Sequence, residues 1–189
     1  MDQNQKMIEL KFIYNYDSAL IASANQSGKS TLIKNIISKI PKEDVLVLDT
    51  QNGFKEYPNR LFPIHHNSEI FDAFIIKART LNNKTICLDD ADLFNLKNSK
   101  QFIDLLIGAN HQRLGVILSV RRILGINKIL LQNIHYLIFS SNIPLEDKEY
   151  LDKALGKQLD WETIDKLPKY HFIVYDSYTR TYNEVETVI

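Results

Sequence analysis

The stretch from residue 23 to residue 31 constrains the fold of this chain more than any other, and it reads Ser-Ala-Asn-Gln-Ser-Gly-Lys-Ser-Thr. The apolar run at 19–22 that precedes it is typical of a buried strand. In residues 32–40, which follow it, apolar side chains recur at helical spacing. Because a strand, a tight turn and a helix surround the Gly-Lys-Ser sequence, the motif predicts a phosphate-binding loop (P-loop).

The residue types of this loop suit the chemistry of phosphate binding. Backbone N–H groups of the turn and of the first helical residues point at one spot, and Gly28 lets the backbone approach a ligand closely. We expect Lys29 to reach the β- and γ-phosphates and the Ser30 hydroxyl to bind Mg²⁺. The other candidate nucleotide-binding residues are Ser23, Asn25, Gln26, Ser27 and Thr31.

Two observations bear on this interpretation of the loop. Ser23 stands where the full motif has glycine, and we expect its small side chain to permit the turn with more strain. The alternative is a helix N-terminus that spells Gly-Lys-Ser-Thr by chance. The agreement of the flanking strand and helix patterns favours the P-loop.

An apolar strand that ends in acids follows at residues 84–92, and this is the Walker B pattern. Asp89, at the strand tip, is expected to hold the Mg²⁺ shell. Asp90 is expected to orient or deprotonate the attacking water, a role more often filled by Glu, and Asp92 is a nearby alternative. The competing interpretation is a strand followed by an acidic turn.

Two further strands end in charged residues. The apolar run at 114–120 leads into Arg121 and Arg122, and buried cations are costly unless they meet anions; a nucleotide phosphate or solvent would serve. The run at 44–49 ends in Asp49, at the sheet edge where open α/β sheets bind ligands. Asp49 is expected either to support the site or to form a turn.

The remaining elements follow from periodicity and from turn residues. The first predicted helix should stop near Pro41, and Ser68 should cap the next one. Tyr14 is a candidate for stacking on a base, or a strand residue, whereas His65 and His66 are a weak metal signal beside the alternative of exposed polar side chains. Further strands are predicted at 7–14, 61–66 (at best a short edge strand), 135–140, 170–176 and 179–188, the last two as an antiparallel edge hairpin, and helices at 68–78, 102–109, 126–133, 145–155 and 161–167.

Composition limits the classes of function. The 189 residues suggest one domain, 1–189, and 23 basic against 23 acidic residues give a net charge of zero. Any DNA contact must therefore come from a local patch or from a ring of several copies. The single cysteine, Cys87, favours a reduced intracellular setting. No apolar run is long enough to cross a bilayer, and the polar first residues do not resemble a signal peptide.

From Ser18 to Tyr175, the chain resembles the FtsK/HerA superfamily of P-loop DNA-translocating ATPases, in particular the small viral genome-packaging ATPases. Beyond the Walker motifs, the family has a basic-His segment, a Gly-containing core strand and then Gln-Arg-Pro or Arg-Arg-Pro. This sequence has Asn-His-Gln-Arg-Leu-Gly at 110–115, then the strand, then Arg121-Arg122-Ile123. Residues 167–175 also resemble the end of small members.

The resemblance implies a three-layer α/β P-loop NTPase fold (RecA/FtsK-HerA-like) with a mainly parallel central sheet and a C-terminal edge hairpin. It implies an ATP-hydrolysing, Mg²⁺-dependent translocase of double-stranded DNA, which acts as a hexameric or pentameric ring in the packaging of a viral genome. Candidate partners are capsid or internal-membrane proteins of a virion, and the expected location is the host cytoplasm or the virion.

The resemblance also implies roles for the arginines. Arg121 falls on the family's sensor Gln or Arg, Arg122 falls on its Arg, and one arginine acts on ATP bound to the neighbouring subunit. Besides Ser23 and Asp90, two positions depart from the family. Ile123 replaces Pro, and Asn110 stands where the family usually has arginine. Arg113 is the nearby substitute, so Arg122 and Arg113 are both candidates for the trans-acting finger.

Two other functions stay open at this point. A small-molecule or nucleotide kinase shares the P-loop and the size, but such kinases usually carry an Arg-rich lid, and no such cluster is present in the sequence. A nucleotide-binding assembly module without turnover is compatible with Asp90 in place of Glu and Ser23 in place of Gly.

Overall fold

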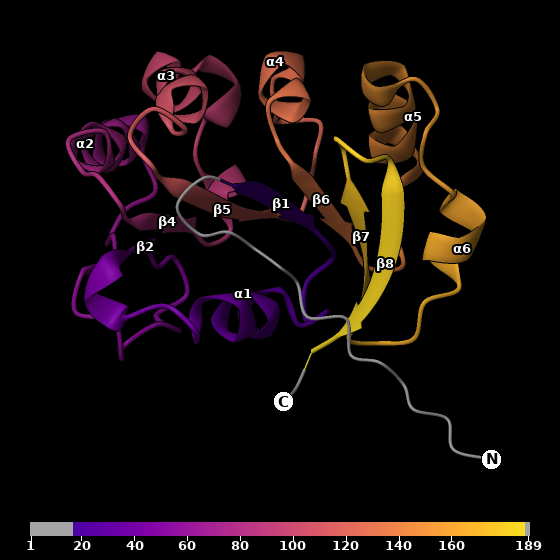
Figure 1. Ribbon diagram of the computed structural model, residues 1–189, viewed down its shortest axis with the longest axis horizontal. Helices are drawn as coiled ribbons and strands as arrows, with labels where there is room; N and C mark the ends of the chain where they lie inside the picture. Colours follow the sequence, from indigo (N-terminus) through magenta and orange to yellow (C-terminus); the bar gives the residue numbers. More distant parts are fainter. Residues whose placement is uncertain (1–16, 188–189) are drawn as a thin grey trace.

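The computed structural model describes residues 17–187, and its centre is an eight-stranded sheet in the order β3-β2-β4-β5-β1-β6-β7-β8 (Figure 1). The strands β3, β2, β4, β5, β1 and β6 are all parallel to one another. Strand β7 pairs antiparallel with β6, and β8 pairs antiparallel with β7. The strands are β1 Ser18–Ala22, β2 Val45–Leu48, β3 Arg60–Leu61, β4 Thr85–Leu88, β5 Gly115–Val120, β6 Tyr136–Phe139, β7 His171–Asp176 and β8 Thr181–Glu186.

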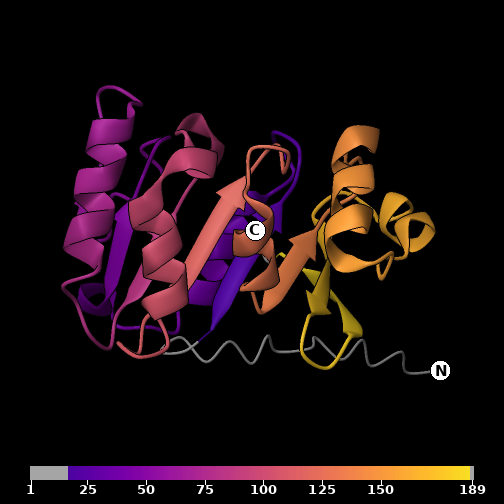
Figure 2. The ribbon, with the colours of Figure 1, turned by 90° about the horizontal axis from the view of Figure 1, so that it is seen from above.

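Helices cover both faces of this sheet. One face carries α2 to α5 and the other carries α1, as Figure 1 shows, and Figure 2 shows the larger group lying in front of the strands. The α-helices are α1 Lys29–Ile37, α2 Ser68–Ala78, α3 Lys100–Gly108, α4 Lys128–Gln132, α5 Leu145–Leu155 and α6 Trp161–Asp165. The short 3-10 helices are Lys42–Asp44, Ala91–Leu93 and Leu96–Asn98.

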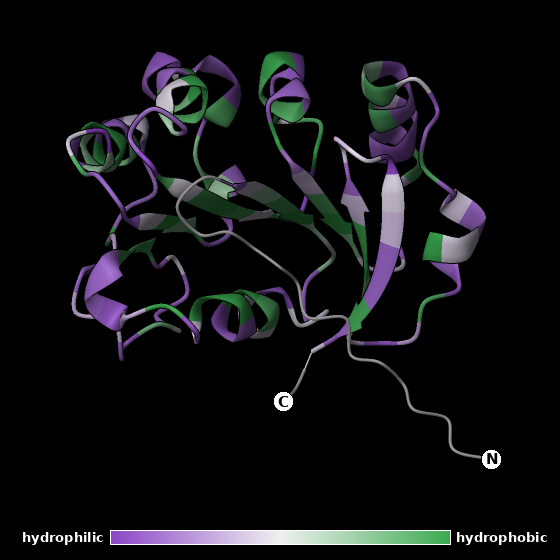
Figure 3. Cartoon of the chain, in the orientation of Figure 1, coloured by the Kyte–Doolittle hydropathy of each residue, from purple (hydrophilic) through white to green (hydrophobic). Residues whose placement is uncertain are grey.

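The alternation of side chains along each strand divides the apolar core into two layers. In β1, Leu20 and Ala22 pack on the side of α2 to α5, whereas Ala19 and Ile21 pack on the side of α1. The central strands are hydrophobic along their length because both of their faces are covered, and β8 at the open edge is largely hydrophilic (Figure 3). The structure is thus a three-layer α/β sandwich, as predicted.

Strand direction determines where a ligand site can form. Because β1, β4 and β5 are parallel, the residues that follow them meet at one edge of the sheet. The antiparallel strands bring the start of β7 and the end of β8 to the same edge. The P-loop, the Walker B acids and the arginines of residues 121–122 therefore share this edge, although they lie far apart in the sequence.

Most elements predicted from the sequence are present, and the C-terminal hairpin is confirmed as β7 and β8. The prediction that Ser68 caps α2 is wrong. Asn67 is the cap, and its side chain accepts a hydrogen bond from the Ile70 N–H group, because its backbone is extended while Ser68 is already helical. The predicted strand at 7–14, with Tyr14, lies outside the described residues. No helix within residues 17–187 is long and apolar enough to span a membrane.

Asp49 is fully buried at the tip of β2 and organises the loop that follows it. Its carboxylate accepts hydrogen bonds from the N–H groups of Gly53, at 2.9 Å, and Phe54, at 3.0 Å. The Arg60 guanidinium lies 2.7 Å from the same carboxylate. The sequence left two roles open for Asp49. Its hydrogen bonds are made to the loop that follows β2, so they favour the role of a turn former.

We predict that the Arg60→Ala substitution lowers the free energy of unfolding by about 3 kcal/mol, because it leaves the buried Asp49 carboxylate without its cation. Urea unfolding measures this change. Arg79→Ala is the matched control, because the Arg79–Asp104 pair is about a third exposed on both sides, and it should lose about 1 kcal/mol or less. Equal losses in the two variants would contradict the assigned role of Asp49.

Candidate functional site

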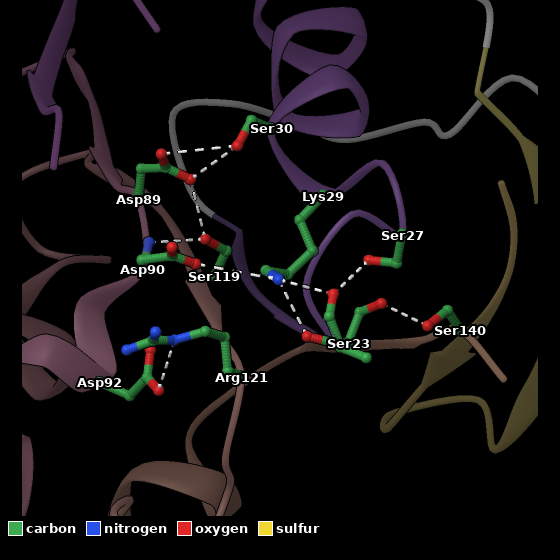
Figure 4. A network of polar contacts seen from close by, with 11 residues as sticks. Ser23, Ser27, Lys29, Ser30, Asp89, Asp90, Asp92, Ser119, Arg121 and Ser140 are labelled. Atoms are coloured by element: carbon green, nitrogen blue, oxygen red, sulfur yellow. Dashed lines mark hydrogen bonds and ion pairs between the residues drawn. The ribbon is translucent and has the colours of Figure 1, made fainter. Parts of the chain in front are cut away.

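The Lys29 side chain occupies the centre of the P-loop and is only 6% exposed. Its ammonium donates hydrogen bonds to the carbonyl oxygens of Ser23, at 2.9 Å, and Ala24, at 3.0 Å, and lies 3.8 Å from Oδ1 of Asp90 (Figure 4). Burial lowers the pKa of Lys29, and the nearby carboxylates, Asp90 first, oppose this shift. The loop therefore holds its lysine inward, beside the acid at the tip of β4.

The backbone of the loop has the form that phosphate binding requires. Gly28 is left-handed, with a φ of 98°, and it caps α1, whose first turn contains no acidic residue. The N–H groups at this helix start are oriented for an anion, and no neighbouring carboxylate of the first turn competes for the position. Ala24 to Gln26 are exposed, Ser27 is half-buried and bonds the Ala24 carbonyl through its hydroxyl, and Thr31 is half-buried.

Ser23, the departure from the glycine pattern, is fully buried and hydrogen-bonds through its hydroxyl to Ser140, at the tip of β6. The expected strain is absent, because Ser23 has no positive φ, and the left-handed conformation falls on Gln26, with a φ of 59°, and on Gly28. A side chain at position 23 is therefore compatible with the loop and links it to the neighbouring strand. No pattern in the sequence predicts this role of Ser140.

Asp89 lies fully buried at the tip of β4, beside the start of α1. Its carboxylate accepts hydrogen bonds from the hydroxyl groups of Ser30, at 3.2 Å, and Ser119, at 3.1 Å. Burial, with the neighbouring Asp90 charge, raises the pKa of Asp89 to about 6, although the two hydroxyl groups favour the ionised form. A buried carboxylate next to a serine hydroxyl fits Mg²⁺, which takes oxygen ligands and usually only one or two from the protein.

Asp90 is buried and left-handed, with a φ of 45°. Its N–H group donates to the Ser119 hydroxyl at 2.8 Å, which fixes the strained backbone. Burial raises the pKa of Asp90, and the positive charges of Lys29 and Arg121 oppose the shift. The carboxylate thus faces the space between the lysine and the arginine, where a terminal phosphate and its attacking water would meet.

Ser119 is a site residue that was not predicted from the sequence, although it is the one polar side chain in the apolar strand β5. Its hydroxyl donates to Asp89 while it accepts from the Asp90 backbone, so a single side chain aligns both acids (Figure 4). Its signal in the sequence is a serine two positions before Arg121, in a strand that is otherwise buried and apolar.

Arg121 extends from the end of β5 to Asp92, with 3.3 Å between Nε and Oδ2 (Figure 4). The other carboxylate oxygen of Asp92 is buried and has no hydrogen-bond partner. Arg121 also lies close enough to Lys29 and Asp90 to influence their pKa values. The strand-end cation therefore meets a carboxylate, and it borders the lysine–acid centre of the site.

The other two predicted arginines make different contacts. Arg122 pairs with the buried Asp147 of α5, at 3.0 Å, and with Glu146, at 3.6 Å, while half of its side chain remains exposed. Arg113 precedes β5 and so lies at the opposite edge of the sheet from the P-loop, with a left-handed φ of 54°. Neither joins the lysine–acid centre within one subunit, and a role in trans stays a prediction for both.

Within residues 17–187, the histidine pair does not belong to a larger cluster of metal-ligating side chains. His66 packs edge-on against Phe94, with 5.5 Å between ring centroids, and His65 is exposed. Within this range, no group of three or more His, Cys, Asp or Glu side chains could hold a metal ion.

Strand β5 lies between the P-loop strand and the Walker B strand, and the chain has the α/β fold of P-loop NTPases. No protein-family model and no curated protein sequence matches the chain.

Solved structures that share this fold include two viral packaging ATPases and a toxin domain. The DNA-packaging ATPase B204 from Sulfolobus turreted icosahedral virus has a TM-score of 0.78 and 16% identity, over 93% of this chain and 100% of that one. The genome-packaging NTPase B204 from Sulfolobus turreted icosahedral virus 2, in complex with ATP-gammaS, has a TM-score of 0.77 and 17% identity, over 92% and 98%. The N-terminal domain of zonular occludens toxin from Neisseria meningitidis is more distant, with a TM-score of 0.55 and 9% identity, over 92% and 95%. The chain therefore resembles viral genome-packaging ATPases in structure.

The raised pKa of Asp89 predicts a pH-dependent stability of the protein without metal and nucleotide. The folded carboxyl titrates near pH 6 and the unfolded one near 3.8, so the folded state holds the extra proton between these values and loses stability as the pH rises through them. Asp89→Asn removes this titration. The free energy of unfolding of the variant minus that of the parent should therefore rise between pH 4 and pH 7, by about 3 kcal/mol at most.

Urea unfolding in EDTA, at a series of pH values, measures the difference between variant and parent, in which the titration of all other groups cancels to first order. A difference that stays constant from pH 4 to pH 8 would contradict the assigned environment of Asp89.

Proposed function

We propose that this protein is an Mg²⁺-dependent ATPase that moves double-stranded DNA as a ring of identical subunits, in the packaging of a viral genome. The observation that carries the proposal is the convergence of Lys29 and Ser30 of the P-loop on Asp89 and Asp90 of the next-but-one strand. This convergence joins a phosphate cradle to a metal-binding acid and a second acid that can act on water.

Nucleotide binding begins with an exchange of partners at Lys29. Its ammonium now bonds two loop carbonyls and faces Asp90, and it turns to the β- and γ-phosphates when these enter the loop. The N–H groups at the start of α1 donate to the same phosphates. Asp89 and Ser30 would hold Mg²⁺, which would supply charge neutralisation for the phosphates.

Hydrolysis requires a base near the terminal phosphate, and Asp90 is our first candidate. It is held rigidly by its N–H contact with Ser119, and its pKa is raised, which makes it a stronger base than an exposed aspartate. Asp92, with its unpartnered buried oxygen, is the alternative. Arg121 lies beside both acids and is placed to stabilise charge on the phosphoryl group as it is transferred.

The DNA and ring components of the proposal rest on the family resemblance and on the structural neighbours. One neighbour is described as a DNA-packaging ATPase and another was solved with ATP-gammaS bound. The net charge of zero favours DNA contact by a local patch or by several copies together. We propose a hexamer or pentamer that works in the host cytoplasm or at the virion, with capsid or internal-membrane proteins as partners.

The Lys29→Ala variant should lose phosphate release from ATP, because it removes the fixed cation of the cradle. The Asp90→Asn variant should keep ATP binding and lose turnover by about a hundredfold or more. Phosphate release, measured with and without double-stranded DNA on protein of known oligomeric state, tests both variants, and DNA should stimulate the parent. Asp92→Asn is the matched control.

A Lys29→Ala protein that hydrolyses ATP like the parent would overturn the P-loop assignment. If Asp92→Asn loses phosphate release while Asp90→Asn changes it little, the general base is Asp92 rather than Asp90. Tight ATP binding without phosphate release in the parent would indicate an assembly module instead.

If an arginine of one subunit acts on ATP bound to its neighbour, two inactive variants should restore ATPase activity to each other when mixed. An Arg122→Ala subunit mixed with a Lys29→Ala subunit should recover part of the activity in mixed rings, because each supplies what the other lacks. Each variant alone should fall by about 10³-fold or more. The control mixture combines Lys29→Ala with Asp90→Asn; it should stay inactive, because both changes damage the site of their own subunit.

The Arg113→Ala subunit forms a second arm of this experiment. Recovery with Arg113→Ala but not with Arg122→Ala would assign the finger to Arg113 and leave Arg122 as the partner of Asp147. No recovery in either arm, in rings shown to be mixed, is the result that would exclude an arginine acting in trans from these positions.

A further inference from the structure

The positions of the acids fix the direction in which a nucleotide must lie across the P-loop. Asp89, Asp90 and Arg121 follow β4 and β5, which lie on one side of β1 in the sheet. The terminal phosphate must face these groups if they are to act on it. The nucleoside end must therefore leave the loop on the other side of β1, toward β6, β7 and β8. This step rests on the nucleotide binding proposed above.

A tyrosine lies against the P-loop on that side. Tyr170 directly precedes β7, and a Cβ atom built on Gly28 would lie 3.0 Å from its Cδ1 atom. A Cβ atom at this position would crowd the aromatic ring, so glycine suits this close approach. The tyrosine ring is half-buried, so part of it remains open to a ligand at the edge of the loop.

The backbone of Tyr170 is held in an unusual conformation. Its φ is 70°, a left-handed value that is rare for a bulky side chain. The Tyr170 carbonyl accepts hydrogen bonds from the N–H group of Thr187, at 3.1 Å, and from its hydroxyl, at 3.3 Å. Thr187 itself is buried, at 3% exposed. The end of β8 thus fixes the tyrosine against the loop, and strain of this kind is typical of functional positions.

We propose that Tyr170 is the stacking platform for the base of the bound nucleotide. Bases stack on aromatic side chains through their faces, and such stacking accepts different bases because each has a π-face. Tyr170 combines the required side of the loop, contact with Gly28 and a partly exposed ring. The site takes a nucleoside triphosphate, and the ring supplies affinity for the base rather than discrimination between bases.

Lys169 completes this end of the site. Its exposed ammonium lies 4.7 Å from the centroid of the Tyr170 ring. No hydrogen bond or ion pair ties Lys169 to another described residue, so its flexible chain can leave the ring when a base stacks there.

Calorimetric titration of the full chain with Mg²⁺-ATP and with Mg²⁺-tripolyphosphate, which has no nucleoside, tests the proposal. Tyr170→Leu should weaken ATP binding by about tenfold or more and leave tripolyphosphate binding unchanged. Tyr170→Phe should bind both like the parent, because the ring remains. Tyr178→Leu is the matched control, since Tyr178 lies in the turn between β7 and β8, at the opposite sheet edge, and is 70% exposed.

A second measurement needs no variant and applies even if Tyr170→Leu does not fold. The parent should bind ribose 5-triphosphate, which lacks only the base, about tenfold more weakly than ATP. Equal binding of these two ligands, or unchanged ATP binding by Tyr170→Leu, would overturn the role of Tyr170. Failure of the parent to bind either ATP or tripolyphosphate would instead overturn the proposed nucleotide-binding function.

Discussion

The arrangement of the site depends on the contacts of the buried Lys29 ammonium group. A lysine that is 6% exposed must be surrounded by acceptors, and two loop carbonyls with the Asp90 carboxylate meet this need. These contacts shape the loop before any phosphate arrives. They also hold the Asp90 carboxylate beside the loop, 3.8 Å from the ammonium.

The parallel sheet converts this local contact into a complete site. The carboxyl ends of the parallel strands β1, β4 and β5 lie at one edge of the sheet. Lys29, the two acids and Arg121, which follow these strands, are therefore close together. Ser119 connects the parts, since its hydroxyl bonds both the Asp89 side chain and the Asp90 backbone. Each acid is thus held by the strand that also leads into Arg121.

The antiparallel hairpin brings further residues to the same edge of the sheet. Because β7 and β8 reverse direction, Tyr170 and Thr187 reach the P-loop edge from the side opposite to the acids. The loop therefore has carboxylates against it on one side and an aromatic ring on the other. This asymmetry matches the nucleotide orientation proposed above, in which the phosphates face the acids and the base faces the ring.

The P-loop, the strand that ends in Asp89 and Asp90, the arginines after β5 and the edge hairpin could all be predicted from the amino-acid sequence, because each depends on neighbouring residues or on a short period. Which side chains meet in space depends on the folded arrangement of the strands. The Ser23–Ser140 and Arg121–Asp92 contacts and the approach of Tyr170 to Gly28 join residues separated by dozens of positions, and strand order brings them together. Similarly, the separation of Arg113 from the P-loop follows from strand direction, which no local pattern encodes.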